Sequence, residues 1–186
     1  RVWDVESGQL VRQLEGHEEK TPNNYPSMLY CCSISADGKF AVTGDRVGHV
    51  VVLALASGKE LAALETPIMY TWDPRARRHS IGGIRSVAFS PDGQSVAVGG
   101  MDKVGNIDHL QGKARVEIFN WAKGERTVEY ASDTYKGLVE CMHFSADGKY
   151  LAAGGGDHNG FLMFLDPESG KLIHEDKAPM HVHEFC

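Results

Sequence analysis

Three near copies of one segment recur at a constant spacing along this chain. They read ISADGKFAVTG at residues 34–44, FSPDGQSVAVGG at 89–100 and FSADGKYLAAGG at 144–155. The aspartates in their turns, Asp37, Asp92 and Asp147, are 55 residues apart at each step. Because repetition at a fixed period of this size is typical of solenoids and propellers, we expect the whole chain to be built from one repeated unit.

Each copy predicts a β-hairpin. In the middle copy, Pro91 presets φ for the first central position of the turn, Asp92 suits the second, and Gly93 accepts the conformation that closes the hairpin. Short runs of small, branched or aromatic residues flank this turn at 84–90 and 95–98, as expected of buried strands. The residues interpreted as structural repeat motifs in these turns are Asp37, Gly38, Asp92, Gly93, Asp147 and Gly148.

A second turn recurs between further short apolar runs, at 7–8, 57–58, 123–124 and 169–170. The unit therefore has four strands, and helical periodicity is nowhere sustained. Two inserts of about 11 residues, at different places, account for the 55-residue step and leave a basic unit of about 44 residues. That length is within the ~40–45 residues expected of a four-stranded propeller blade.

Two residue pairs near the start of the chain add a family resemblance. Trp3-Asp4 ends a predicted third strand, and Gly16-His17 follows a predicted fourth strand. With the three Asp-Gly turns, these pairs make essentially the whole chain resemble WD40 repeats. The resemblance implies an all-β fold, a β-propeller of four-stranded antiparallel blades, with about three complete blades plus partial blades at both ends.

The resemblance implies that residues 1–186 form a single propeller segment. We expect strands c and d of a partial blade at 1–15, complete blades at 28–65, 84–131 and 138–176, and the start of another blade at 181–186. Because the chain opens in mid-strand and stops as a strand begins, we expect it to be a piece of a longer protein.

The copies depart from the family pattern. The positions that match Trp3-Asp4 are Leu53-Ala54, Phe119-Asn120 and Leu165-Asp166, and only Thr43 keeps the hydroxyl expected in the second strand. The hydrogen-bonded network of Trp, Ser or Thr, His and Asp that the family implies is therefore incomplete in each whole blade. We expect apolar packing to hold the blades together.

Composition narrows the class of protein. The formal net charge of -6 argues against general nucleic-acid binding, and no apolar run approaches the ~18 residues of a membrane-spanning helix, so we expect neither nucleic acid nor membrane as a partner. Cys31, Cys32, Cys141 and Cys186 lack metal-ligand spacing, so we expect buried free thiols. Free thiols favour a reducing compartment such as the cytoplasm. No cofactor is expected.

The long loops suggest where function lies. Loops 18–27, 66–83 and 100–114 all belong to the connections that the resemblance places on one face, whereas the other face has only tight turns. Loops on a rigid frame commonly carry recognition. The candidate partner-binding residues are Tyr70, Trp72, Arg75, Arg77, Arg78 and His109. Tyr, Trp and Arg dominate interface hot spots, and arginines suit an acidic peptide or a phosphate group. We therefore expect a non-catalytic domain that binds a protein or peptide.

Two other readings stay open. The first is a propeller enzyme or metal-binding propeller, which requires several of Asp45, His49, Asp102, His109, Asp157 and His158 to converge at the channel mouth. His181 and His183 form a further weak chelating pattern. The second is a structural segment whose binding surface lies in other blades of the parent propeller. Those remaining blades would then be partners of this segment.

Two further expectations concern single residues. We expect Arg85 to pair with Glu140, and His79 to be the histidine of the hydrogen-bonded network in its blade.

Overall fold

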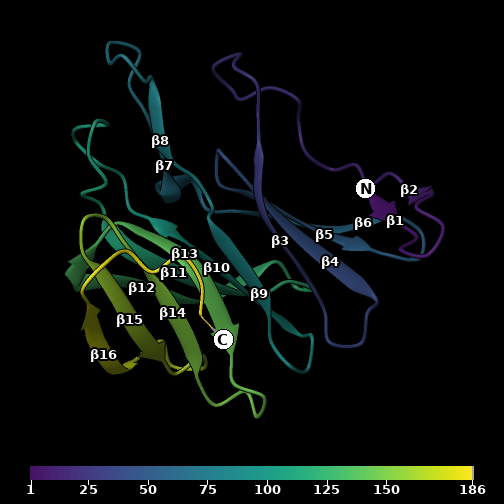
Figure 1. Cartoon of the computed structure of the whole chain (residues 1–186). Coiled ribbons are helices and arrows are strands. Elements are labelled where there is room, and N and C mark those ends of the chain that lie inside the picture. The colour runs from purple at the N-terminus through teal and green to yellow at the C-terminus, as the bar shows by residue number, and fades with distance from the viewer. Residues whose placement is uncertain (186) are drawn as a thin grey trace.

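The computed structural model describes residues 1–185, and it contains three four-stranded antiparallel sheets (Figure 1). The first sheet comprises β3 (Leu29–Ile34), β4 (Phe40–Asp45), β5 (His49–Ala54) and β6 (Glu60–Glu65). The second comprises β9 (Ser86–Phe89), β10 (Ser95–Met101), β11 (Lys113–Asn120) and β12 (Glu125–Lys136). The third comprises β13 (Leu138–Phe144), β14 (Leu151–Gly156), β15 (Gly160–Leu165) and β16 (Leu172–Ala178). In each sheet every strand pairs with the next in sequence, so the predicted all-β fold of propeller blades is confirmed.

Two small hairpins complete the strands. β1 (Val2–Trp3) pairs with β2 (Leu10–Arg12), and β7 (Tyr70–Trp72) pairs with β8 (Ser80–Gly82) after a 3₁₀ turn, η1 (Pro67–Met69). The segment 66–83, expected to be a long loop, is therefore partly a hairpin that projects beyond the sheets in Figure 1.

The C-terminal segment continues beside the third sheet. Residues 181–185 form no strand, but the Val182 N–H donates to the Gly155 carbonyl at 3.2 Å, and the side chains of Val182 and Phe185 pack against Gly154. The corresponding contact in the first sheet is the Ile84 N–H to the Asp45 carbonyl, at 3.0 Å. The segment thus follows the path of an inner strand. Cys186 lies outside the described residues.

The core lies between neighbouring sheets. Successive side chains of a strand point to opposite faces, so Val96 and Val98 of β10 pack toward the first sheet while Ala97 packs toward the third. One apolar cluster thus joins the first and second sheets, and the other joins the second and third. The inner strands β3, β9 and β13 lie side by side. Burial of apolar side chains between blades therefore supplies the main stabilisation.

Small residues allow the blades to approach closely. A Cβ added to Gly44 would stand 2.6 Å from Ile84 Cγ2, and one added to Gly99 would stand 2.8 Å from Val139 Cγ1. These two glycines occupy the same place in consecutive repeats. Glycine is therefore needed at this position because the inner strand of the next blade passes directly over it.

The three repeated turns share one hydrogen-bond pattern. In the first, the Ser35 hydroxyl donates to Asp37 Oδ1 at 2.7 Å and the Lys39 N–H donates to the same oxygen at 3.0 Å. Gly38 has a φ of 69°, in the left-handed region that glycine tolerates. Ser90 with Asp92, and Ser145 with Asp147, repeat the contact at 2.5 and 2.8 Å. The serine before each turn is thus part of the motif.

These turns predict a pH dependence of stability. The Ser35 hydroxyl and Lys39 lower the pKa of Asp37 to about 2, and Lys149 and Ser145 do the same for Asp147. Since the unfolded value is about 3.9, this stabilisation is complete above about pH 4 and is lost as the pH falls toward 2. We expect the difference in melting temperature between wild type and the Asp37→Asn, Asp147→Asn variant to shrink across that range. A difference that stays constant would contradict this assignment.

The cysteines differ in their exposure. Cys31, Cys32 and Cys141 are free thiols, as expected. Cys141 is buried and Cys31 is half-buried, and burial raises the pKa of both thiols to about 12. Cys32 is exposed, so the expectation of a buried thiol is wrong at that position. Adjacent residues of a strand face opposite ways, which explains why Cys31 and Cys32 differ.

Candidate partner-binding face

The hairpin β7–β8 is anchored at its base by the backbone. The Gly83 N–H donates to the Met69 carbonyl at 2.7 Å, and Met69 itself is buried. Gly82 and Gly83 have φ values of 96° and 91°, and a Cβ on Gly83 would stand 2.6 Å from the Arg46 carbonyl oxygen. These glycines hold the hairpin firmly against the end of the first sheet, in a conformation that a larger residue would disfavour.

An aromatic cluster lies along this hairpin. The Trp72 ring centroid is 5.2 Å from that of Tyr25, in loop 18–27, and 5.8 Å from that of His79. The Tyr25 and His79 centroids are 5.6 Å apart. Trp72 is therefore half-buried by a residue that the sequence did not single out. This tilted aromatic contact stabilises the packing of two loops that are about 50 residues apart in sequence.

The three long loops lie on one side of the molecule (Figure 1), and the hairpin contacts each of the other two. Tyr25 joins loop 18–27 to the hairpin, and the Val104 N–H of loop 100–114 donates to Thr71 Oγ1 at 3.1 Å. Between loop 18–27 and β7 lies a cavity of about 700 Å³. Its lining includes the aromatic residues Tyr70 and Trp72 and side chains of both charges, among them Lys20, Lys103, Glu18 and Glu65. We call the surface formed by loops 18–27, 66–83 and 100–114 the long-loop face.

The candidate arginines lie at the end of the hairpin. Arg75, Arg77 and Arg78 are all exposed, and no carboxylate of residues 1–185 forms an ion pair with any of them. His109 is also exposed, but it belongs to loop 100–114 and does not line the cavity that contains Tyr70 and Trp72. The structure therefore brings Tyr70 and Trp72 together at the cavity, with the arginines beyond them and His109 apart.

The repeat-motif residues near the N-terminus, Trp3, Asp4, Gly16 and His17, lie in different environments. Trp3 is half-exposed on β1, and Asp4 accepts hydrogen bonds from the Ser7 hydroxyl at 2.6 Å and its N–H at 2.7 Å, which lower the Asp4 pKa. Gly16 packs closely against the Val51 side chain. His17 lies against the first sheet, where it joins a polar network.

That network contains three members. His17 Nε2 lies 2.8 Å from Thr43 Oγ1, and Nδ1 lies 3.1 Å from Asp45 Oδ2. Burial opposes ionisation of Asp45, but hydrogen bonds from His17 and from the His49 and Val47 N–H groups keep its pKa below the ordinary value. The residue paired with Thr43 on β5 is Val51. An apolar residue therefore stands opposite the threonine.

His79 does not act as a network histidine. It has a φ of 60°, contacts Trp72 and Tyr25, and its buried Nδ1 has no hydrogen-bond partner within residues 1–185. The expectation for His79 is therefore wrong. The turn at 73–79 places this ring on the aromatic cluster instead of on the neighbouring sheet.

The acidic residues of the alternative reading each contact residues near their own sheet. Asp45 contacts His17, Asp102 contacts Arg115 at 2.8 Å, and Asp157 accepts from the N–H groups of the residues that follow it. Within residues 1–185, no three His, Cys, Asp or Glu side chains are grouped so that they could hold a metal ion. His181 and His183 stack with ring centroids 4.4 Å apart. The convergence that this reading requires is thus not found among the described residues.

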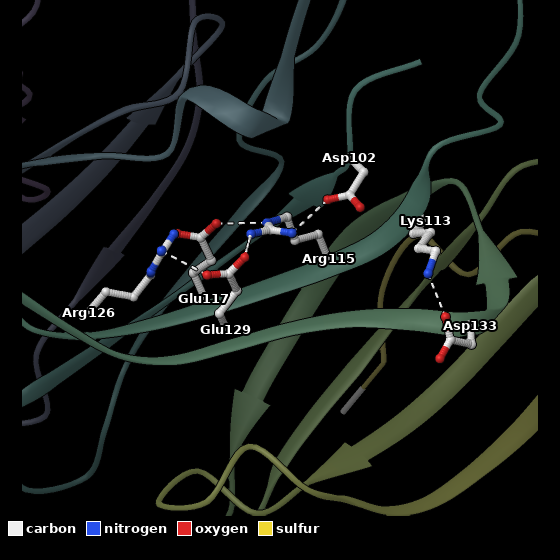
Figure 2. Close-up of polar contacts among 7 residues, drawn as sticks. All are labelled: Asp102, Lys113, Arg115, Glu117, Arg126, Glu129 and Asp133. Carbon is white, nitrogen blue, oxygen red and sulfur yellow. Dashed lines mark hydrogen bonds and ion pairs between the residues drawn. The ribbon is translucent and has the colours of Figure 1, made fainter. Parts of the chain in front are cut away.

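The sequence reasoning missed a buried ionic network (Figure 2). Arg115 donates to Glu117 Oε1 at 2.7 Å, to Asp102 Oδ1 at 2.8 Å and to Glu129. Arg126 bonds the other Glu117 oxygen at 3.1 Å. Burial by itself would lower the pKa of Arg115, because it disfavours the charged form. The hydrogen bonds to Glu117 and Glu129 outweigh that effect, so the Arg115 pKa is raised. The available signal was RVEIF at 115–119, where two charges at alternate positions share one face of an apolar strand.

Comparison with known proteins agrees with this architecture. Four-stranded repeats packed around inner strands define the class of β-propeller repeat proteins. The model of the family "WD domain, G-beta repeat" matches residues 74–104 and 129–161. The chain therefore carries WD40 repeats at these two stretches. No helix within residues 1–185 is long and apolar enough to cross a membrane.

Three relatives show the range of proteins that this chain resembles. Eukaryotic translation initiation factor 3 subunit I of Candida albicans is 22% identical, over 92% of this chain and 43% of its own length. Protein HIR1 of Gibberella zeae is 30% identical over 69% of this chain and 12% of its length. Telomerase protein component 1 of Rattus norvegicus is 24% identical over 83% of this chain and 5% of its length. The chain spans less than half the length of each of these relatives.

Proposed function

We propose that this WD40 domain is a non-catalytic interaction module that binds a protein or peptide through the long-loop face. The observation that carries the proposal is the meeting of three long loops around a cavity of about 700 Å³ with Tyr70 and Trp72 in its lining. Concave sites with aromatic walls and a few polar groups are the usual form of a binding site. Aromatic and arginine side chains also dominate the energetics of protein interfaces.

The charge at the end of the hairpin β7–β8 favours an acidic partner. Arg75, Arg77 and Arg78 are exposed and have no ion-pair partner within residues 1–185, although the chain as a whole carries a net charge of -6. Unpaired arginines present planar forks of N–H donors that match carboxylate and phosphate groups. An acidic or phosphorylated segment of a partner would supply the missing counter-charges.

The relatives support a role in assembly. One is named as a subunit of a translation initiation factor and another as a protein component of telomerase. Both names describe proteins that belong to larger assemblies. We infer that this chain contributes a binding surface to such an assembly in the same general way.

Further blades of a propeller are a second class of partner. Leu29 and Ile34 on β3 are 56% and 61% exposed, and Val11 on β2 is 60% exposed. Apolar side chains on an innermost strand are ordinarily covered, and exposed sheet surfaces of this kind promote association. We infer that additional blades cover this side of the first sheet.

Replacement of Arg75, Arg77 and Arg78 by Ala together is expected to abolish capture of the principal partner while the fold is kept. The three side chains are exposed and unpaired, so their loss removes binding contacts without uncovering the core. The measurement is affinity capture with the full-length protein, followed by quantitative mass spectrometry.

The matched control changes Lys59, Lys123 and Lys171 to Ala. These lysines are exposed in the turns between the third and fourth strands of each sheet, so the control removes the same charge from elsewhere. Its set of captured partners should equal that of wild type. Equal loss in both variants, or no loss in either, would refute binding through the long-loop face.

A further inference from the structure

A second, smaller cavity lies at the base of the long-loop face and has an unusual charge. Its volume is about 300 Å³, and it lies between the hairpin β7–β8, the end of β4 and the start of β9. The polar residues in its lining are Tyr30, Arg46, Tyr70, Arg78, Ser80 and Arg85. The rest of its lining is Ile81, Gly82, Leu110 and Leu138. Three arginines and no carboxylate therefore line one small cavity.

Arg85 is held in place without a counter-ion among residues 1–185. Its Cζ lies 3.9 Å from the centroid of the Tyr30 ring, so its guanidinium is positioned over the aromatic face. Its Nε is buried and has no hydrogen-bond partner within residues 1–185. The sequence suggested a pair with Glu140, but Glu140 lies 3.9 Å from His181 Nε2 and forms no ion pair with Arg85. A guanidinium over a ring keeps its N–H donors at the edge, available to a ligand.

Arg46 is fixed by neutral acceptors. It donates to Ser80 Oγ at 2.6 Å and to the Pro26 carbonyl at 3.4 Å. These bonds set its direction without neutralising its charge. Arg46 therefore keeps its positive charge in the same cavity as Arg85. Because the two charges share a small and partly buried volume, the cavity is strongly positive.

The Tyr70 hydroxyl adds a neutral donor. Its oxygen is buried and lies near the Ser80 side chain, but it makes no hydrogen bond of good geometry within residues 1–185. Burial raises the pKa of Tyr70, while Ser80 and the Arg46 charge oppose that shift. The hydroxyl therefore keeps its proton at neutral pH. Buried polar groups in native structures are almost always satisfied by protein, ordered water or a bound group, so Tyr70 Oη and Arg85 Nε are two donors open to a ligand in this cavity.

Arg115, which has a structural role, differs from the arginines of the smaller cavity in its partners. Arg115 is buried against three carboxylates, those of Asp102, Glu117 and Glu129. The arginines of the smaller cavity have none, in a chain with 25 acidic residues. Arg46 and Arg85 are half-buried, so their guanidinium groups lose part of their hydration without a counter-charge in the lining, and an external anion would supply it.

We propose that the smaller cavity binds a compact oxyanion, a phosphate or carboxylate group. Arg85 supplies the oriented fork, Arg46 a fixed positive charge, the Tyr70 hydroxyl a neutral donor, and Arg78 an exposed charge at the opening. Binding of a free oxyanion does not depend on the function proposed above. That a partner protein carries the group rests on that function.

The first test is calorimetric titration of the full-length protein with inorganic phosphate at constant ionic strength. Arg85→Ala is expected to weaken binding at least tenfold, which is about 1.4 kcal/mol. Arg85→Lys should recover only part of the affinity, since lysine keeps the charge but loses the planar fork. Lys59→Ala, which removes a positive charge from an exposed turn, should bind like wild type. Melting curves identify any variant that has lost its fold, and Arg78→Ala, at an exposed position, then serves in place of Arg85→Ala.

Two further probes distinguish the kinds of oxyanion. Acetyl-phosphoserine amide and acetyl-glutamate amide carry the two groups on the same backbone, and stronger binding of one identifies the group that the cavity prefers. Absence of phosphate, phosphoserine and glutamate binding to folded wild type would overturn the proposal. So would equal binding by folded wild type, Arg85→Ala and Arg78→Ala. In either case, retained partner capture that is sensitive to the hairpin arginines would leave the interaction function intact.

Discussion

Replacement of Arg115 by Met is expected to destabilise the protein by about 3–5 kcal/mol. Glu117 is fully buried, with 0% of its surface exposed, and Arg115 is its closest cation at 2.7 Å. Loss of Arg115 leaves this carboxylate with Arg126 alone, at 3.1 Å and on a half-exposed side chain. A buried charge deprived of its partner costs far more than the pair itself contributes. Urea unfolding followed by circular dichroism measures the change in unfolding free energy.

The double variant Arg115→Met, Glu117→Met is the matched control. It removes both charges and fills the space with apolar atoms, so we expect it to be closer to wild type in stability than the single variant. Asp102 and Glu129 are less buried than Glu117 and remain hydrated in both variants. A double variant that is less stable than Arg115→Met would show that the network stabilises the blade by itself.

The second large effect is expected for Phe89→Ala, at about 3–5 kcal/mol. Phe89 ends β9, pairs with Val96 of β10 and is 9% exposed in the cluster between the first and second sheets. Removal of its ring leaves a cavity between two blades that the rigid strands cannot close. Thermal and urea unfolding measure the loss.

Ile173→Ala provides the comparison for Phe89. Ile173 lies on β16 and is 58% exposed, so its truncation should change stability by less than about 0.5 kcal/mol. Unchanged stability of a folded Phe89→Ala variant would mean that the ring is not part of the core and that the strand register deduced from the repeat is wrong.

The long-loop face has two cavities with different chemistry. For the partner proposed above, the larger cavity offers the rings of Tyr70 and Trp72 among charged side chains of both signs, whereas the smaller cavity has three arginines. Tyr70 lines both, so the two sites adjoin. A segment with an apolar residue near a negatively charged one would contact both cavities, which makes charge and sequence together the expected basis of specificity.

The sequence predicted the local features of the fold correctly, but it did not predict the contacts between segments that are distant in sequence. The turns around Asp37, Asp92 and Asp147 were recognisable because each depends on residues within a few positions of one another. The hairpin β7–β8 was not foreseen, because the insert between 66 and 83 lacks the alternation that predicts a strand. The exposed thiol of Cys32 and the position of His79 were misjudged for a related reason, since both depend on which face packs against a neighbour.

By itself, the sequence determined the repeated four-stranded unit and its tight turns. Both follow from spacing and from the backbone preferences of Asp, Gly and Pro, whereas the expectation that the long loops share one side came from the resemblance to WD40 repeats. The tertiary structure alone decided that Tyr25 covers Trp72, that Arg115 gathers three carboxylates and that Arg85 lies over Tyr30 without a counter-ion. These contacts depend on how strands and loops far apart in the sequence meet, and local patterns along one strand do not specify that geometry.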